Sequence, residues 1–214
     1  MRTTIVAPSG IYAELEEGSR DRFSLPEAIV IEGSADRDGA IMALIGEEAA
    51  HNFEVAPPNE EVIGISSRSE TILKMVDNVR PMRSNRTGLF GKITLSIVGI
   101  GAVEPSSMLA RNGNAFLASE LAEAAEAGGV GDIGPKIFDK IGRPVKTPLD
   151  NRVNGMTLEK QARTDRVFAL AGGRAETDAI RGALMTREVD VLISDKFTAE
   201  RLQETGPDHG TEAN

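Results

Sequence analysis

Cysteine is absent from this 214-residue sequence, and aromatic residues are scarce, with no Trp, one Tyr and seven Phe. Without thiols the chain can form no disulfide, zinc finger, iron–sulfur site or catalytic cysteine. The two histidines, His51 and His209, are far apart in the sequence, which argues against a histidine-based metal site. Hydrophobic residues still make up 40% of the chain, an ordinary fraction for a globular domain, so we expect a folded, aliphatic core.

Long apolar runs and a positive charge balance are also missing. No window holds eighteen uninterrupted apolar residues, and no apolar signal region follows Met1, so we expect neither a transmembrane helix nor a leader peptide. The formal net charge is −9, and an acidic surface repels nucleic-acid phosphates, so we expect no direct DNA contact. These absences favour a cytoplasmic domain without a cofactor.

Five short runs rich in β-branched residues predict buried strands. Because the runs are continuously apolar rather than alternating, they favour a mostly parallel sheet that is covered on both faces. Helical patterns fall between them, and this alternation predicts an α/β fold with helices on both faces of the sheet. The predicted strands are 28–32, 61–65, 93–99, 166–171 and 189–194, and the predicted helices are 39–51, a helix after Ser69, 116–127, 175–185 and 197–204.

Two segments do not fit this alternation. The arginine-containing stretch 80–91 has no clear period and predicts a long exposed loop. Residues 205–214 are polar and rich in turn formers, so we expect a disordered tail there.

A cluster of hydroxyl groups follows the second predicted strand, at the start of a helix. It comprises Ser66, Ser67, Arg68, Ser69 and Thr71. Helix N-termini offer free N–H groups and a positive dipole end, and the hydroxyls and the arginine add further donors for an anion. Simple N-capping by one serine is the alternative, but it needs only one of these side chains.

Two later strand-to-helix junctions carry similar chemistry. Gly172 and Gly173 would let the backbone approach a ligand, and Arg174 could reach an anion, although a tight turn explains the glycines equally well. Asp195 follows the last predicted strand, where it could hydrogen-bond a sugar hydroxyl or cap the next helix.

Glycines also follow the strand at 93–99. Gly101 marks a close approach of the backbone, and Glu104 could bind sugar hydroxyls or act as a base. The segment 129–134 matches the dinucleotide pattern G-x-G-x-x-G, but it follows a helix instead of a strand, so we reject a nucleotide site. We interpret it as a glycine-rich loop that presents Asp132 to a ligand. Because the ends of parallel strands share one edge, these junctions together predict a polar site for a hydroxyl-rich, phosphorylated small molecule.

The order of several segments resembles the effector-binding domain of SorC/DeoR-type sugar-responsive transcriptional regulators. They are GISSRSET, IVGIGAVEPSSMLARNGNAF, GGVGDIGPKIFD, RVFALAGGRAETDAIRGAL and VDVLISDKFTAERL, and the resemblance covers about 11–202 of an expected domain at 11–204. It implies a phosphosugar isomerase-like three-layer fold, a sugar, sugar phosphate or polyol effector, a homo-oligomer, and control of a DNA-binding head. The implied ligand contacts are Ser66, Ser67, Ser69, Thr71, Gly101, Glu104, Asp132, Gly172, Gly173 and Asp195.

This sequence departs from the family pattern in three places. It starts almost directly with the effector domain, so we expect no helix-turn-helix head, and it is shortened around 80–91. Glu176 stands where the family often has a lysine after the two glycines, and a carboxylate repels phosphate at short range. Either Arg174 compensates, or the ligand is an unphosphorylated polyol.

Our sequence-based hypothesis is a carbohydrate-sensing domain that is not an enzyme. One alternative is a phosphosugar isomerase-like enzyme in which Glu104, Asp132 or Asp195 is the base. Another is an oligomerisation partner of full-length regulators.

Overall fold

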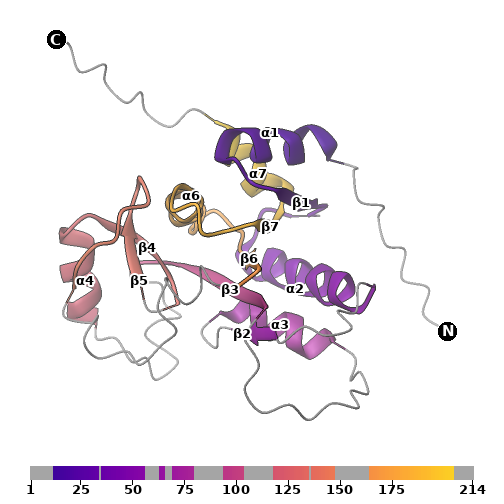
Figure 1. The fold of residues 1–214 in the computed structure, drawn as a ribbon, viewed down its shortest axis with the longest axis horizontal. Coiled ribbons are helices and arrows are strands. Elements are labelled where there is room, and N and C mark those ends of the chain that lie inside the picture. Colours follow the sequence, from indigo (N-terminus) through magenta and orange to yellow (C-terminus); the bar gives the residue numbers. More distant parts are fainter. Residues whose placement is uncertain are drawn as a thin grey trace.

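The computed structural model describes residues 12–33, 35–55, 63–65, 69–79, 94–103, 118–134, 136–147 and 164–204. Helices and strands alternate along most of this chain (Figure 1). In order, the elements are α1 (Ala13–Phe23), β1 (Glu27–Ile31), α2 (Asp38–Val55), β2 (Ile63–Ile65), α3 (Glu70–Asn78), β3 (Leu95–Ala102), α4 (Ala118–Glu126), β4 (Gly129–Ile133), β5 (Lys136–Asp139), β6 (Arg166–Leu170), α6 (Thr177–Met185), β7 (Val191–Asp195) and α7 (Lys196–Gln203).

The strands form one sheet in the order β1-β7-β6-β3-β4-β5, with β2 paired to β3 as well. The pairs β1–β7, β7–β6, β6–β3 and β3–β2 are parallel, whereas β3–β4 and β4–β5 are antiparallel. Strand β3 serves both parts, since Leu95–Gly99 pairs with β6 and Ile100–Ala102 pairs with β4. The prediction of an α/β fold with a mostly parallel sheet is confirmed.

Helices cover both faces of the parallel part of the sheet (Figure 1). Successive residues of β6 alternate between two cores: Val167 and Ala169 pack with α1, α6 and α7, while Phe168 and Leu170 pack with α2 and α3. This burial on both sides explains why the strands appear in the sequence as continuous apolar runs. A third, smaller core joins α4 to the β4–β5 pair.

The structure covers the two outer edges of the sheet. At β1, the backbone N–H of Val30 donates to Glu16 Oε1 of α1 at 3.1 Å. At β5, Val145 N donates to Ile137 O and Asp139 N donates to Arg143 O, both at 2.9 Å. Unpaired strand edges attract other strands, so these contacts limit unwanted pairing at both ends.

The sequence-based interpretation of 129–134 as a loop is wrong, because Gly129–Ile133 is strand β4. Its glycines are buried and close-packed: a Cβ at Gly131 would lie 2.6 Å from the Ala179 Cβ, and a Cβ at Gly129 would lie 2.8 Å from Ala124 O. Packing therefore selects glycine in a strand. Neither α1 nor β5 was predicted from the sequence. Segments 80–91 and 205–214 lie outside the described residues.

Candidate functional site

The parallel strands β1, β2, β3, β6 and β7 all end at the same edge of the sheet. Ligands of α/β proteins bind at this carboxyl edge. The structure places several residues predicted from sequence there: Gly101, Gly172, Gly173 and Asp195, with Ser69 at the start of α3. Ser66, Ser67, Arg68 and Glu104 lie outside the described residues.

Ser69 caps helix α3. Its Oγ accepts a hydrogen bond from the Ile72 N–H at 3.3 Å. The same side chain packs directly on β3, because a Cβ on Gly99 would overlap the Ser69 Cβ. Thr71 is 3% exposed, so its side chain contributes to packing under α3. The positive end of the α3 dipole thus lies at the edge where β3 ends.

The turn between β6 and α6 contains Gly172 and Gly173. Gly173 has a φ of +107°, which favours glycine, and its N–H donates to Thr198 Oγ1 at 2.8 Å. The N–H of Gly172 donates to the carboxylate of Glu176, the N-cap residue of α6. Both glycine N–H groups therefore have acceptors within the protein.

Asp195 is fully buried and supports this turn through Thr198. Its Oδ1 accepts from the N–H groups of Phe197 and Thr198, at 3.0 and 3.1 Å, which caps helix α7. Its Oδ2 accepts from Thr198 Oγ1 at 2.6 Å. Since Thr198 Oγ1 in turn accepts from Gly173 N, the carboxylate organises the backbone. A ligand contact at Asp195 stays a prediction.

Arg174 does not extend over the turn. Its backbone N–H donates to Asp38 Oδ1 at 3.2 Å, and its side chain, 77% exposed, pairs with Asp36 at 3.1 Å. Asp36 also pairs with Arg201 of α7. Hydrogen bonds and charge from Arg201 and then Arg174 lower the pKa of the Asp36 carboxyl. The role of Arg174 as a compensating charge for a ligand stays untested.

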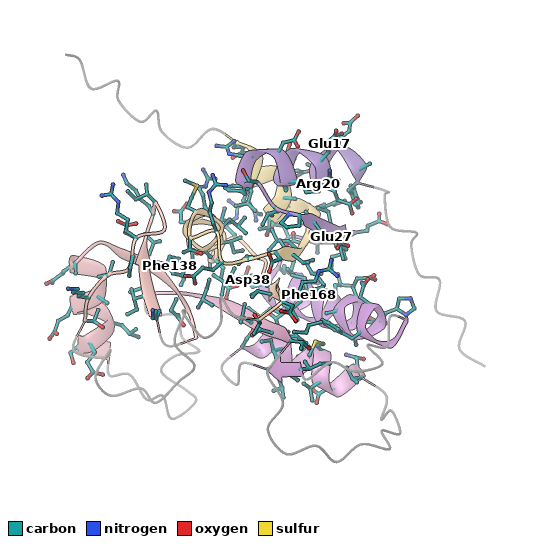
Figure 2. The ribbon with its side chains drawn as sticks, in the orientation of Figure 1. Glu17, Arg20, Glu27, Asp38, Phe138 and Phe168 are labelled. Atoms are coloured by element: carbon teal, nitrogen blue, oxygen red, sulfur yellow. The ribbon has the colours of Figure 1, made fainter. Side chains whose placement is uncertain are left out.

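Three carboxylates approach one another near the start of α6. Burial and then the nearby charges of Asp38 and Asp132 together raise the pKa of Glu176 to about 8, against the lowering effect of the Gly172 N–H. Asp132 reaches this place from β4, where it is paired in register with Gly101 and its Oδ1 lies beside that glycine. Asp38 comes from the first turn of α2 and lies near the middle of the molecule (Figure 2).

Glu176 and Asp38 were not among the site residues predicted from the sequence. The departure from the family lysine at Glu176 was a usable signal. Asp38 gave none, because only the fold brings the start of α2 against the β6–α6 turn.

This edge offers hydrogen-bond acceptors to a hydroxyl-rich ligand and a helix N-terminus at α3 to an anion. Within the described ranges, no group of three or more His, Cys, Asp or Glu side chains is arranged to hold a metal ion. In the same part of the chain, no helix is both long and apolar enough to cross a bilayer.

Comparison with known proteins shows which family this chain is similar to. A family model for a sugar-binding domain matches residues 84–204. The erythritol catabolism regulatory protein EryD of Brucella abortus is 38% identical over 108 residues, which cover 50% of this chain and 34% of that regulator. The chain therefore matches only about a third of this relative's length.

Solved structures extend the similarity to almost the whole chain. The sugar-binding domain of a DeoR-type transcriptional regulator from Pseudomonas syringae pv. tomato is 30% identical, with a TM-score of 0.71, over 90% of this chain and 99% of that one. The sorbitol operon regulator SorC of Klebsiella pneumoniae has the same fold, with 17% identity and a TM-score of 0.76, over 95% of this chain and 85% of that one. The α/β sheet, its polar carboxyl edge and these similarities together show that the chain belongs to the sugar-binding domain family of SorC/DeoR-type transcriptional regulators.

Proposed function

We propose that this domain binds a sugar, sugar phosphate or polyol at the carboxyl edge of its sheet and acts as a cytoplasmic sensor. The observation that carries the proposal is the meeting of Asp38, Asp132 and Glu176 with the α3 N-terminus at one edge of a sugar-binding fold. Carboxylates accept hydrogen bonds from vicinal hydroxyls, which are the groups that distinguish carbohydrates from other small metabolites.

The two ends of the edge suit different ligand groups. The N-terminus of α3 is positive and carries the Ser69 hydroxyl, so it favours a phosphate or another electron-rich group. The α6 end carries carboxylates and favours hydroxyl donors. An extended ligand could therefore bind in one orientation only.

A sensing role fits better than catalysis. The relatives in which this domain occurs are named transcriptional regulators. Both carboxylate oxygens of Asp195, one of the three candidate bases, accept hydrogen bonds that hold α7 and the β6–α6 turn. A base that is held this way cannot take a substrate proton without loosening the fold.

A thermal-shift screen tests the proposal. The probes are erythritol, suggested by the name of the Brucella relative, together with free sugars and sugar phosphates. A ligand at a hundred times its Kd adds about 2.7 kcal/mol, which should raise the Tm by roughly 5–10 °C in a chain of this size. Asp132→Asn should reduce the shift, and Asp21→Asn, on the exposed face of α1, should not. If no carbohydrate shifts the Tm, the proposal is wrong.

We also propose that two copies of the chain associate through the β2–α3 apolar surface, which comprises Ile63, Ile65, Leu73, Val76 and Val79. All five side chains are at least 36% exposed, and Leu73 is 56% exposed. The isoleucines pair in register with Leu95 and Ile97, which lie in the core under α3. Exposed apolar surfaces of this kind are typical of interfaces.

A second copy is the proposed occupant because the five side chains carry no charge, and a two-fold interface brings the same patch of both copies together, so apolar side chains would meet apolar side chains. Among the described strands, β2 pairs only with β3, whereas other contacts cover the edges of β1 and β5. Leu73→Glu should shift the chain toward monomer in sedimentation velocity. Met185→Glu is the control, since Met185 is 42% exposed but lies on α6. A monomeric parent chain would contradict the proposal.

A further inference from the structure

The turn between β6 and α6 has the sequence of an anion-binding loop but not its free hydrogen-bond donors. Phosphate binds such turns through successive backbone N–H groups at a helix N-terminus. Here each of three successive N–H groups already has an acceptor in the protein. Gly172 N–H donates to Glu176, Gly173 N–H to Thr198 Oγ1 at 2.8 Å, and Arg174 N–H to Asp38 Oδ1 at 3.2 Å.

The protein thus supplies its own hydrogen-bond acceptor at this helix end. Glu176 is the N-cap residue of α6, and its carboxylate takes the donor that an incoming phosphate would use. Two further contacts hold the turn in this state: Thr177 Oγ1 donates to Gly173 O at 3.2 Å, and Thr198 Oγ1 donates to Asp195 Oδ2. A phosphate would have to break these bonds to bind here.

The charges around Glu176 act in the same direction. Asp38 faces it from α2 and Asp132 faces it from β4, and both raise its pKa. Strand β3, which also packs against α6, contributes no ionisable side chain at Leu95–Ala102. Arg174 is directed to Asp36, and no lysine or arginine contributes to the shift at Glu176. The local field is therefore negative, and it repels a phosphate strongly at short range.

We propose that Glu176 determines the ligand specificity of this edge: it hydrogen-bonds an uncharged hydroxyl of a polyol and excludes phosphate from the α6 end. This rests on the proposed carbohydrate-binding function. It assigns the polyol end of the ligand to α6 and leaves the α3 N-terminus as the place for any phosphate.

The protonation state of Glu176 supports this assignment and makes it measurable. With a pKa of about 8, the side chain is mostly a neutral acid at pH 7, and a neutral acid can both donate to and accept from a hydroxyl. Deprotonation adds a third negative charge beside Asp38 and Asp132 and removes the donor. Polyol binding should therefore weaken as the pH rises through about 8.

Isothermal titration of the whole chain with four- to six-carbon polyols and with their monophosphates tests the inference. Glu176→Lys should raise affinity for the monophosphate relative to the free polyol by at least about tenfold, because it reverses the local charge. Glu176→Gln keeps a neutral donor and acceptor, so it should bind the free polyol within about threefold of the parent at pH 7 and lose the pH dependence near 8. Glu188→Gln is the matched control, because burial also raises the pKa of Glu188, which lies near Lys136 and away from this turn.

The outcomes separate this inference from the proposed function. If the parent chain binds polyols but Glu176→Lys leaves the affinity ratio unchanged, or Glu176→Gln keeps the pH dependence, Glu176 does not set specificity and the carbohydrate-binding function stands. If the parent chain binds neither polyols, sugars nor their phosphates, both ideas are wrong. If Glu176→Lys does not fold, the pH dependence of polyol binding by Glu176→Gln decides whether Glu176 sets the specificity.

Discussion

Replacing Glu176 by glutamine should change how the stability of the domain depends on pH. In the folded chain the pKa of Glu176 is raised from 4.5 to about 8. Between these two values the folded state holds a proton that the unfolded state has released. The free energy of unfolding therefore falls as the pH rises through this window, and it levels off above about 8.

The size of the effect follows from the shift. One pKa unit corresponds to about 1.36 kcal/mol, so the stability that Glu176 removes between pH 4.5 and 8.5 is about 4 kcal/mol. Glutamine does not titrate and fits the same space. The free energy of unfolding of Glu176→Gln relative to the parent should therefore rise by about this amount over the same pH range.

Urea denaturation of both proteins at several pH values between 4.5 and 9 measures this difference directly. The control is Glu17→Gln, because Glu17 is exposed on α1 (Figure 2) and should give a curve parallel to that of the parent chain. Parallel curves for Glu176→Gln and the parent chain would refute the reasoning, because the carboxyl would then titrate at its ordinary pKa.

Two further predictions concern the framework of the edge. Asp195→Ala should lower the free energy of unfolding by about 2–4 kcal/mol in urea denaturation, because it removes the α7 cap and leaves the buried Thr198 hydroxyl without its acceptor; a loss below about 1 kcal/mol would contradict this role. Gly99→Ala should cost about 1–3 kcal/mol and weaken ligand binding, because the new Cβ overlaps Ser69 and displaces the start of α3. Gly39→Ala, where no atom lies within 4 Å of the added Cβ, should change stability by less than about 1 kcal/mol, and an equal loss in both variants would show that packing at Gly99 is not the cause.

The strands buried on both faces were predictable from sequence, and the Gly-rich strand was not. Strands β1, β3, β6 and β7 are apolar on both sides, because helices cover both faces of the sheet. In β4 the buried positions are Gly129, Gly131 and Ile133. Neighbouring atoms leave no space for a Cβ at the two glycines. Tertiary packing therefore requires glycine at these strand positions, although glycines at this spacing are typical of a turn.

Helix α1 was missed for a different reason. The stretch AELEEGSRDRF buries only Ser19 and Phe23, so it shows almost no apolar period. Its position depends on distant contacts: Arg22 donates to Gln203 O at 2.7 Å, and Gln203 Nε2 donates to Leu15 O at 3.1 Å. Such contacts leave no local trace in the sequence.

The location of the candidate site in the fold was predictable from the sequence, but the arrangement of its charged side chains was not. Strand ends with Gly, Ser and Asp located the edge, since parallel strands end together. The direction of Arg174 toward Asp36 and the approach of Asp38 to the β6–α6 turn depend on the loop before α2. The sequence alone could therefore place Arg174 near an anion but could not show that the anion is a side chain of the same protein.

The pairing of β1 with β7 has a consequence for synthesis on the ribosome. Strand β1 has a single strand partner among the described residues, and its register joins Glu27 to Val191 and Ile31 to Asp195. Helix α1 packs on α7, which follows that partner directly. At usual translation rates, on the order of ten seconds pass between the emergence of the two strands. During that interval β1 lacks its strand partner, so its apolar residues stay unpaired until β7 has left the ribosome.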